Sequence, residues 1–253
     1  MSAPIVALHG WALNRGVYDG IAKEIVAATG REFLALDLPG HGRTPESAAL
    51  QAAWHSEAVA DDLLARMPPR SVVLGWSLGG SIALQMAAQA PQRIAALVLI
   101  STTPRFAAAS DWSCGADPAV LEGFAAHLSR DYRRTVTEFL ELQVRGSMSA
   151  EATLKKLRVA LERQGDCEPE VLQRAVTWLH RLDLRAVLAR IEQPSIVITG
   201  QYDRIVHPQA SHALAKLLPH ARCIEIARCG HAPFLSHPEE FLTVVGEFVR
   251  ALP

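Results

Sequence analysis

Short runs of apolar residues alternate with longer segments of mixed polarity along the first hundred residues of the chain. The apolar runs have the length of buried β-strands, and the segments between them are rich in helix-forming residues. We predict strands at 4–8, 33–36, 71–75 and 94–100. We predict helices at about 17–28, 54–66 and 77–90. This alternation is typical of βαβ units, so it predicts a mostly parallel sheet with helices on both faces.

The alternation stops after Ile100 and resumes at Ser195. The residues between show several helical patterns and no convincing strand. The last predicted elements are strands at 195–199 and 222–226 and a helix from 238 to about 251. We therefore divide the chain into an α/β core, residues 1–104 and 191–253, and a helical insertion, residues 105–190. A helical insertion of this kind is expected to form a cap, or lid, over the carboxyl edge of the sheet.

A serine at a sharp turn between a strand and a helix is the most informative local feature. Gly75-Trp-Ser-Leu-Gly79 follows the apolar run 71–74 and precedes the helix-forming segment 81–90. Strand, tight turn and helix in this order form a nucleophile elbow. Its glycines have no Cβ, so strand and helix can approach closely around a strained turn. Ser77 is thus the candidate nucleophile, held out at the end of the sheet near the positive end of a helix.

The partners that a serine nucleophile needs are expected later in the chain, the acid first and the histidine last. Asp203 comes just past the predicted strand 195–199, and His231 just past the strand 222–226. Catalytic groups of open α/β sheets gather at the carboxyl ends of such strands. A serine hydroxyl attacks well when a histidine takes its proton and an acid fixes that histidine. We therefore predict Asp203 and His231 as the acid and the base.

An oxyanion hole is the remaining requirement, normally formed by two backbone N–H groups. We expect one N–H from Leu78, directly after the nucleophile, and the other from Trp11 in the loop after the first strand. The competing interpretation is structural, with Asp203 and His231 as ordinary loop residues and Trp11 as a packing aromatic. Asp37 also follows a predicted strand, but its Asp-Leu-Pro-Gly-His-Gly continuation is typical of a structural turn.

Composition narrows the class of protein. The chain has 253 residues, of which 49% are hydrophobic and 20% charged, with a formal net charge of −1. These values are typical of a globular protein with a sizeable core and do not suggest nucleic acid as a partner. No apolar run approaches about 18 residues and no basic leader precedes the first strand, so we expect a cytoplasmic protein that spans no membrane.

The cysteines have no metal-ligand spacing. They favour free thiols in a reducing cytosol, although an even number also allows a disulfide. The four are Cys114, Cys167, Cys223 and Cys229.

The chain resembles the α/β-hydrolase superfamily over essentially its whole length. The resemblance rests on the motifs at Leu8–Asn14, Asp37–Arg43, Gly75–Gly80 and His231–Pro238. Within the superfamily the chain is similar to the family of pimeloyl-[acyl-carrier-protein] methyl ester esterases of biotin synthesis. The more specific parts of this second resemblance are the Trp76 elbow, the Trp11 loop and the segment Phe139–Gln143.

The resemblance implies a reaction and a set of site residues. The reaction is hydrolysis of the methyl ester of a pimeloyl group on acyl-carrier protein, with release of methanol, through an acyl-enzyme and without cofactor or metal. The implied catalytic triad is Ser77, Asp203 and His231. The implied contacts with the acyl substrate are Trp11, Ser77, Leu78, Phe139, Leu140, Glu141, Leu142, Gln143 and His231. We expect a monomer whose partner is the acyl-carrier protein.

The predicted cap carries a net positive charge, which is relevant to binding of the acyl-carrier protein. Between residues 130 and 163 eight basic residues face five acidic ones, a net charge of +3. A solvated helix surface explains such charge by itself, with Arg130, Arg133 and Arg134 on one helical face. The resemblance favours docking of an acidic carrier protein by Arg134, Lys155 and Arg158. Glu138 departs from the family pattern, in which a basic cap residue is expected.

Two other functions stay open. The same triad serves a carboxylesterase or lactonase that acts on free short-chain esters without a protein partner. A second alternative is a non-enzymatic ligand-binding protein on a hydrolase scaffold, because receptors of that kind can keep a triad. A dehalogenase or epoxide hydrolase is disfavoured, since those proteins carry aspartate where Ser77 stands.

Overall fold

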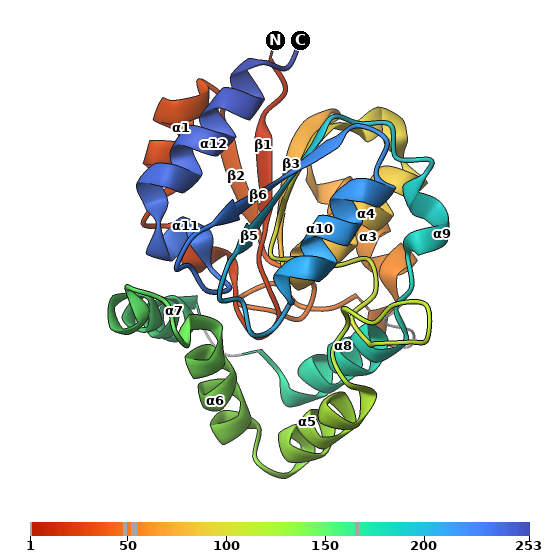
Figure 1. Ribbon diagram of the computed structural model, residues 1–253, viewed down its shortest axis with the longest axis vertical. Helices are drawn as coiled ribbons and strands as arrows, with labels where there is room; N and C mark the ends of the chain where they lie inside the picture. Colours follow the sequence, from red (N-terminus) through yellow and green to blue (C-terminus); the bar gives the residue numbers. More distant parts are fainter. Residues whose placement is uncertain (1, 48–49, 52–54, 165–166) are drawn as a thin grey trace.

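A single parallel sheet forms the centre of the computed structural model, which describes residues 2–47, 50–51, 55–164 and 167–253. Among these residues, six strands pair in the order β2-β1-β3-β4-β5-β6 (Figure 1). The strands are β1 (Ile5–Leu8), β2 (Phe33–Leu36), β3 (Ser71–Trp76), β4 (Ile94–Ile100), β5 (Ser195–Gly200) and β6 (Ala221–Ile226). β1, β3 and β5 are buried along their length, whereas the edge strands β2 and β6 are partly exposed. Strands buried on both faces produce the continuous apolar runs of the sequence.

Successive side chains of each strand point to opposite faces of the sheet. Apolar side chains therefore lie on both faces, and helices cover both. In β3, Val73 packs into one hydrophobic cluster, and Val72 and Leu74 pack into the other. One face is covered by α3 (Ser56–Arg66), α4 (Leu78–Gln89) and α10 (Pro208–Leu217) (Figure 1). The other is covered by α1 (Ala22–Thr29) and α12 (Pro238–Arg250).

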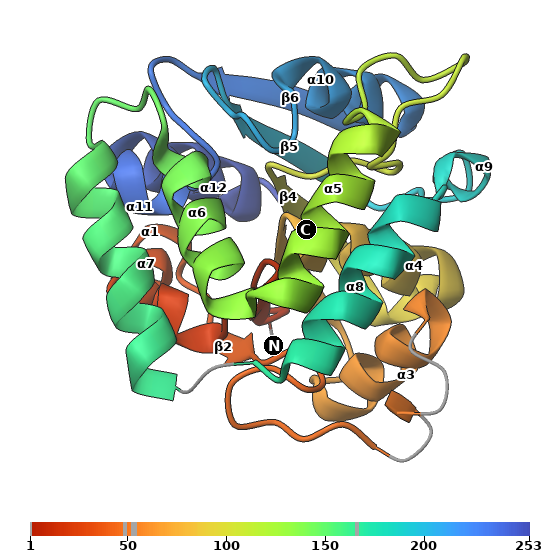
Figure 2. The ribbon, with the colours of Figure 1, turned by 90° about the horizontal axis from the view of Figure 1, so that it is seen from below.

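A run of helices between β4 and β5 lies beyond the carboxyl ends of the strands (Figures 1 and 2). The helices are α5 (Pro118–Arg130), α6 (Tyr132–Val144), α7 (Ala150–Gln164) and α8 (Pro169–Arg181), and the short α9 (Arg185–Leu188) follows them beside α4. Proline occupies the first position of α5 and of α8. The N–H at this position has no hydrogen-bond partner within a helix, so proline, which lacks an N–H, removes no helical bond there. We call α5–α8 the helical segment.

The two ends of the helical segment are joined to each other. The amide of Leu184 donates to the carbonyl of Pro104 at 2.9 Å. Arg105 forms an ion pair with Asp183 at 2.6 Å, and Asp183 also binds Arg185. These bonds close the chain where it leaves and re-enters the core, at the first predicted bound of the insertion and before the second, residue 190.

The predicted α/β-hydrolase fold is confirmed, and most predicted elements are found within one or two residues. The expected helix at 17–28 is wrong in its first half, where a 3₁₀ turn spans Arg15–Tyr18 and α1 begins only at Ala22. The Asn14 side chain accepts from the Gly16 amide and so starts this separate turn. The expected helix at 54–66 begins at residue 54, which lies outside the described residues, and α3 starts at Ser56.

Two general expectations can be compared with the described residues. All four cysteines are free thiols, so the alternative of a disulfide is wrong. None of the helices in the described part of the chain is both long enough and apolar enough to cross a membrane.

Candidate active site

Ser77 sits at a strained turn between β3 and α4. Its φ of 55° is positive, a region that non-glycine residues rarely adopt. The turn is possible because glycines lie two residues before and two residues after Ser77. A Cβ on Gly79 would lie 2.5 Å from the Leu8 carbonyl oxygen, and one on Gly75 would lie 2.6 Å from the Gly79 carbonyl oxygen. The close approach of β3, α4 and β1 therefore holds Ser77 at the carboxyl edge of the sheet.

Asp203 and His231 meet directly. His231 Nδ1 lies 2.9 Å from Oδ1 and 2.8 Å from Oδ2 of Asp203, and both side chains are buried. A carboxylate only accepts hydrogen bonds, so Nδ1 carries a proton and donates it. His231 Nε2 is buried and has no hydrogen-bond partner among the described residues. A ring whose only proton is on Nδ1 presents Nε2 as a free acceptor.

The backbone of His231 is held from two sides. Its N–H donates to the Gln143 carbonyl in α6 at 2.8 Å. Its carbonyl accepts from the indole N–H of Trp76, also at 2.8 Å. Trp76 directly precedes Ser77 and is buried, so the histidine loop is tied both to the elbow and to the helical segment.

The two predicted oxyanion donors come from elements that touch Ser77. Leu78 is the first residue of α4, so its N–H has no partner within the helix. Trp11 follows Gly10, where a Cβ would lie 3.3 Å from the Cβ of Ser77. The Trp11 indole donates to the Leu172 carbonyl at 3.1 Å, which fixes the residue against α8. Both loops thus lie beside the serine.

His9 supports the Trp11 loop, and sequence reasoning missed it. Its Nδ1 lies 2.8 Å from the Gly10 carbonyl oxygen, and its Nε2 accepts from the Leu38 amide at 3.0 Å. This pattern requires a neutral ring with the proton on Nδ1. Burial lowers the pKa of His9 to about 4, so the ring stays neutral near pH 7. The sequence signal that could have identified His9 is a histidine directly before a glycine at the end of a strand.

Asp37 lies in this neighbourhood and not beside His231. Its Oδ1 accepts from the Arg15 amide at 2.7 Å and lies 3.9 Å from His9 Nε2. The neighbouring His41 is fully buried, and burial lowers its pKa to about 3. Asp37 therefore ties two loops together, in keeping with a structural turn.

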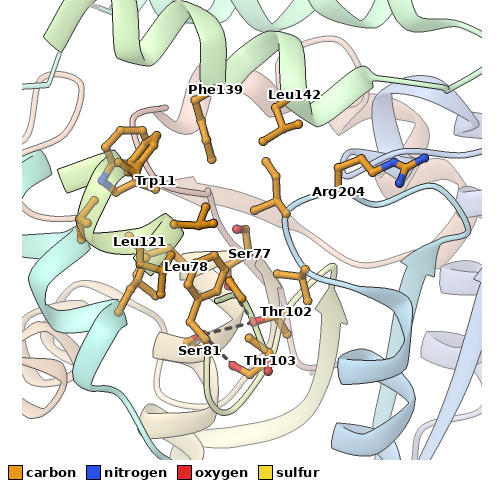
Figure 3. Close-up of a pocket in the computed structure, with 18 residues that line it drawn as sticks. Trp11, Ser77, Leu78, Ser81, Thr102, Thr103, Leu121, Phe139, Leu142 and Arg204 are labelled. Atoms are coloured by element: carbon orange, nitrogen blue, oxygen red, sulfur yellow. Dashed lines mark hydrogen bonds between the residues drawn. The ribbon is translucent and has the colours of Figure 1, made fainter. Parts of the chain in front are cut away.

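An apolar pocket opens above Ser77 (Figure 3). Its walls enclose about 820 Å³ of free space, part of it open to solvent. The helical segment contributes Leu121, Phe124, Phe139, Leu142, Val176 and Leu179 to the walls. The edge of Trp11 packs against the rings of Phe124 and Phe139, with centroids 5.2 and 4.9 Å away. Ser77 thus faces a space suited to a chain of methylene groups.

The predicted contact segment 139–143 divides between several environments. Phe139 and Leu142 line the pocket. Leu140 packs in the hydrophobic cluster on the far side of α6, and Glu141 is exposed and pairs with Arg158. The Gln143 side chain is buried outside the pocket lining, and its two polar atoms have no hydrogen-bond partner among the described residues.

Many residues of the pocket wall were not predicted from the sequence. Leu121 and Phe124 come from α5, and Val176 and Leu179 from α8. Both pairs have the i, i+3 spacing of one helical face, a signal visible in the sequence. That spacing does not distinguish a pocket wall from core packing. Arg204, which also lines the pocket, gave no sequence signal.

The predicted docking residues lie on α6 and α7. Arg134 pairs with Glu138 at 2.8 Å, and Arg158 pairs with Glu141 at 3.1 Å. Lys155 is exposed on α7. All three are on the surface, although two of them have an acidic partner.

The prediction of one face carrying Arg130, Arg133 and Arg134 is wrong. α5 ends at Arg130, and α6 begins at Tyr132. The Asp131 side chain accepts from the Arg134 amide and so starts a new helix between them.

The chain is similar in sequence to known proteins. Residues 3–238 match the family model described as the alpha/beta hydrolase fold. The chain is 41% identical over 249 residues to the pimeloyl-[acyl-carrier protein] methyl ester esterase of Xanthomonas axonopodis pv. citri, covering 98% of this chain and 96% of the relative. It is 39% identical over 239 residues to the protein of the same name from Nitrosomonas europaea, covering 94% and 92%.

Solved structures match the fold at lower identity. An esterase from Exiguobacterium antarcticum superposes with a TM-score of 0.85 at 18% identity, covering 99% of this chain and 92% of that chain. A bromoperoxidase from Bacillus anthracis gives a TM-score of 0.88 at 19% identity, with the same coverage. At these identities the match concerns the fold alone.

Proposed function

The chain belongs to the α/β-hydrolase family, and we propose that it is a serine carboxylesterase that hydrolyses the methyl ester of a pimeloyl group on acyl-carrier protein, as in biotin synthesis. The observation that carries the esterase chemistry is the buried Asp203–His231 pair, whose free Nε2 belongs to a loop bonded to the elbow of Ser77. The named relatives, about 40% identical over nearly the whole chain, support the substrate.

The proposed mechanism has two halves. Ser77 Oγ attacks the ester carbonyl while His231 Nε2 takes its proton, and Asp203 stabilises the imidazolium that forms. The negative charge on the carbonyl oxygen is bound by the amides of Trp11 and Leu78. His231 then gives the proton to the departing methoxy oxygen, and methanol leaves. Water, activated by His231, attacks the acyl-enzyme and releases the free carboxylate and Ser77.

The elbow supports this mechanism before any substrate binds. The positive φ of Ser77 places the amide of Leu78 at the start of α4, whose helix dipole favours negative charge. His9 holds the Gly10 carbonyl, so the Trp11 amide is also fixed in place. Donors that are fixed in advance need no reorganisation as charge develops, which is the main source of oxyanion stabilisation.

The helical segment is proposed as the cap that selects the acyl chain. Its side chains at the pocket are apolar, which suits methylene groups and excludes water from the reacting ester. The insertion of residues 105–190 would then be a cap and the remainder a catalytic core. The bonds of Pro104 with Leu184 and of Arg105 with Asp183 support the first boundary, and they favour a second boundary near residue 184, before the proposed residue 190.

The acyl-carrier protein is the proposed partner, docked on α6 and α7. Arg134, Lys155 and Arg158 are exposed there, in a region with a net charge of +3. Such a patch would steer an acidic carrier towards the pocket mainly by raising the association rate. We propose a cytoplasmic monomer that uses neither nucleic acid nor membrane.

The test is hydrolysis of purified pimeloyl-acyl-carrier protein methyl ester, followed by methanol release and by the mass of the carrier. We expect turnover by the native protein and a loss on the order of 10⁴-fold or more in Ser77→Ala. A fluorophosphonate probe should label Ser77 and no other residue, and Ser81→Ala, one turn away on α4, serves as the control for labelling. Turnover of free short-chain esters together with an inert carrier-bound ester would instead support the free-ester hydrolase.

A further inference from the structure

A single charged residue lines the pocket, counted over the part of the chain that the structure describes. Arg204 comes directly after Asp203 and is exposed. Figure 3 shows its aliphatic stem beside the pocket and its guanidinium directed away from Ser77. Arginine commonly lays its stem along apolar surface while keeping its charged head in water. The guanidinium therefore stands at the rim of the pocket, and the serine stands at its base.

The base of the Arg204 side chain is held firmly. Asp203 Oδ1 accepts from the amides of Ile205 and Val206 at 2.9 and 3.0 Å. The amide of Tyr202 donates to the Cys229 carbonyl at 2.8 Å. The backbone on both sides of Arg204 is thus fixed, whereas its guanidinium forms no hydrogen bond or ion pair with any residue that the structure describes.

Other polar groups of the pocket wall are already satisfied. The Ser81 hydroxyl donates to the Thr103 carbonyl, and the Thr102 hydroxyl donates to the Ser77 carbonyl. The Thr103 hydroxyl donates to the Arg105 carbonyl. A ligand with a polar group away from its ester therefore finds an uncommitted charged donor only at Arg204, among the described residues that line the pocket.

We propose that Arg204 binds an anionic group of the substrate at the pocket rim, with the acyl chain lying between this group and the ester at Ser77. This inference rests on the proposed esterase function. A planar guanidinium suits a carboxylate or a phosphate, because each can accept two of its N–H groups. The substrate class is thus a methyl ester whose apolar chain ends in an anion. Two sources share this chemistry: the free carboxylate of a dicarboxylic half-ester and the phosphate of a carrier's phosphopantetheine arm.

The first test compares two methyl esters of equal chain length, monomethyl pimelate and methyl heptanoate. Arg204→Gln should lower kcat/KM for the anionic half-ester about tenfold more than for the neutral ester, mainly through KM. Arg204→Lys should recover part of the loss, because it keeps the charge without the bidentate geometry. Arg222→Gln, at an exposed arginine of β6 outside the pocket lining, is the matched control.

The source of the anion is separated by two further substrates, methyl pimeloyl-pantetheine with and without its phosphate. A loss in Arg204→Gln confined to the phosphorylated form assigns the phosphate, and a loss confined to monomethyl pimelate assigns the carboxylate. Equal losses on charged and neutral esters, or no loss on any ester, overturn the proposal.

A binding measurement keeps this inference separate from the esterase function. Calorimetry on Ser77→Ala protein reports binding of monomethyl pimelate and methyl heptanoate without turnover. Adding Arg204→Gln should weaken binding of the half-ester about tenfold relative to the neutral ester. Failure of the native protein to hydrolyse any methyl ester would contradict the proposed function. An unchanged binding ratio, together with no loss on the phosphorylated pantetheine ester, would contradict the role of Arg204.

Discussion

The carboxyl edge of the sheet and the helical segment meet at one pocket but are built differently. On the sheet side, polar side chains are fixed by hydrogen bonds, as Asp203 is to His231 and His9 is to Gly10 and Leu38. On the helical side, the pocket wall is made of apolar side chains that make only packing contacts. A hydrogen bond fixes direction, whereas packing fixes only volume. The sheet side is therefore suited to hold the chemistry, and the helical side to choose the chain.

The sharpest way to test this division is Asp203→Asn. The amide side chain can donate to Nδ1, which favours the wrong tautomer of His231 and removes the free acceptor at Nε2. We expect a fall in kcat on the order of 10⁴-fold with the fold intact, measured on a neutral ester alongside circular dichroism. An active Asp203→Asn protein would contradict the assignment and place the acid elsewhere.

A pair of glycine substitutions compares the two regions directly. In Gly79→Ala the new Cβ meets the Leu8 carbonyl oxygen at 2.5 Å, and the backbone must shift. We expect a loss of about 2–3 kcal/mol in the free energy of unfolding, together with a loss of activity. Gly123→Ala in α5 meets no atom within 4 Å and should raise stability by up to about 1 kcal/mol. Denaturant unfolding measures both changes, and equal effects would contradict the contrast between the regions.

Acid should weaken the sheet side through its buried histidines. The pKa of His9 is lowered to about 4 and that of His41 to about 3, both by burial, so the unfolded chain binds protons first as the pH falls. Stability is then complete above about pH 6.5 and decreases below it by up to about 1.4 kcal/mol per pH unit for each histidine. The decrease for His9 continues down to about pH 4.

Denaturant unfolding between about pH 7 and pH 5 measures this slope. His41→Gln should reduce it by about one proton, whereas the same change at the exposed His220 should leave it unaltered. A slope that is the same in His41→Gln and in the native protein would contradict this account.

Charge reversal on the outer surface should affect only the carrier-bound substrate. We expect Arg134→Glu, Lys155→Glu and Arg158→Glu together to lower kcat/KM for the carrier-bound methyl ester about tenfold, and added salt to diminish the difference. Lys23→Glu, on the exposed side of α1, is the control. Equal losses on a p-nitrophenyl ester, or no loss on either substrate, would show that α6 and α7 do not dock the carrier.

The smallest expected effect concerns the pocket wall. Phe139→Ala removes apolar contact with the chain, and each methylene contact is worth up to about 0.8 kcal/mol. KM should therefore rise several-fold for a hexanoyl ester and less for an acetyl ester. Equal changes for both esters would make Phe139 a packing residue only. Leu140→Ala, on the far side of α6, is the matched control for loss of stability.

The sequence predicted the sheet side better than the helical side, for a physical reason. Ser77 and Asp203 follow buried apolar strands, His231 follows the edge strand β6, and parallel strands bring their carboxyl ends to one edge. The loops that carry these residues are short, so a position along the chain nearly determines a position in space.

The walls of the pocket were harder to predict, because they depend on how separate helices pack. The apolar faces of α5 and α8 are visible as i, i+3 pairs, but periodicity does not tell which partner a face meets. Arg204 is a pocket residue only because the loop after Asp203 turns towards the helices. The break at Asp131 could have been found, since aspartate is a strong N-cap residue.

The bond between the Gln143 carbonyl and the His231 amide links the position of α6 to that of the general base. If α6 swings outward, it breaks this bond and loosens the loop of the general base. α5 makes no hydrogen bond to the core within the described residues, and its Val120 is 65% exposed at the pocket. α6 therefore contributes both to the pocket wall and to the alignment of the general base, whereas α5 contributes to the pocket wall alone.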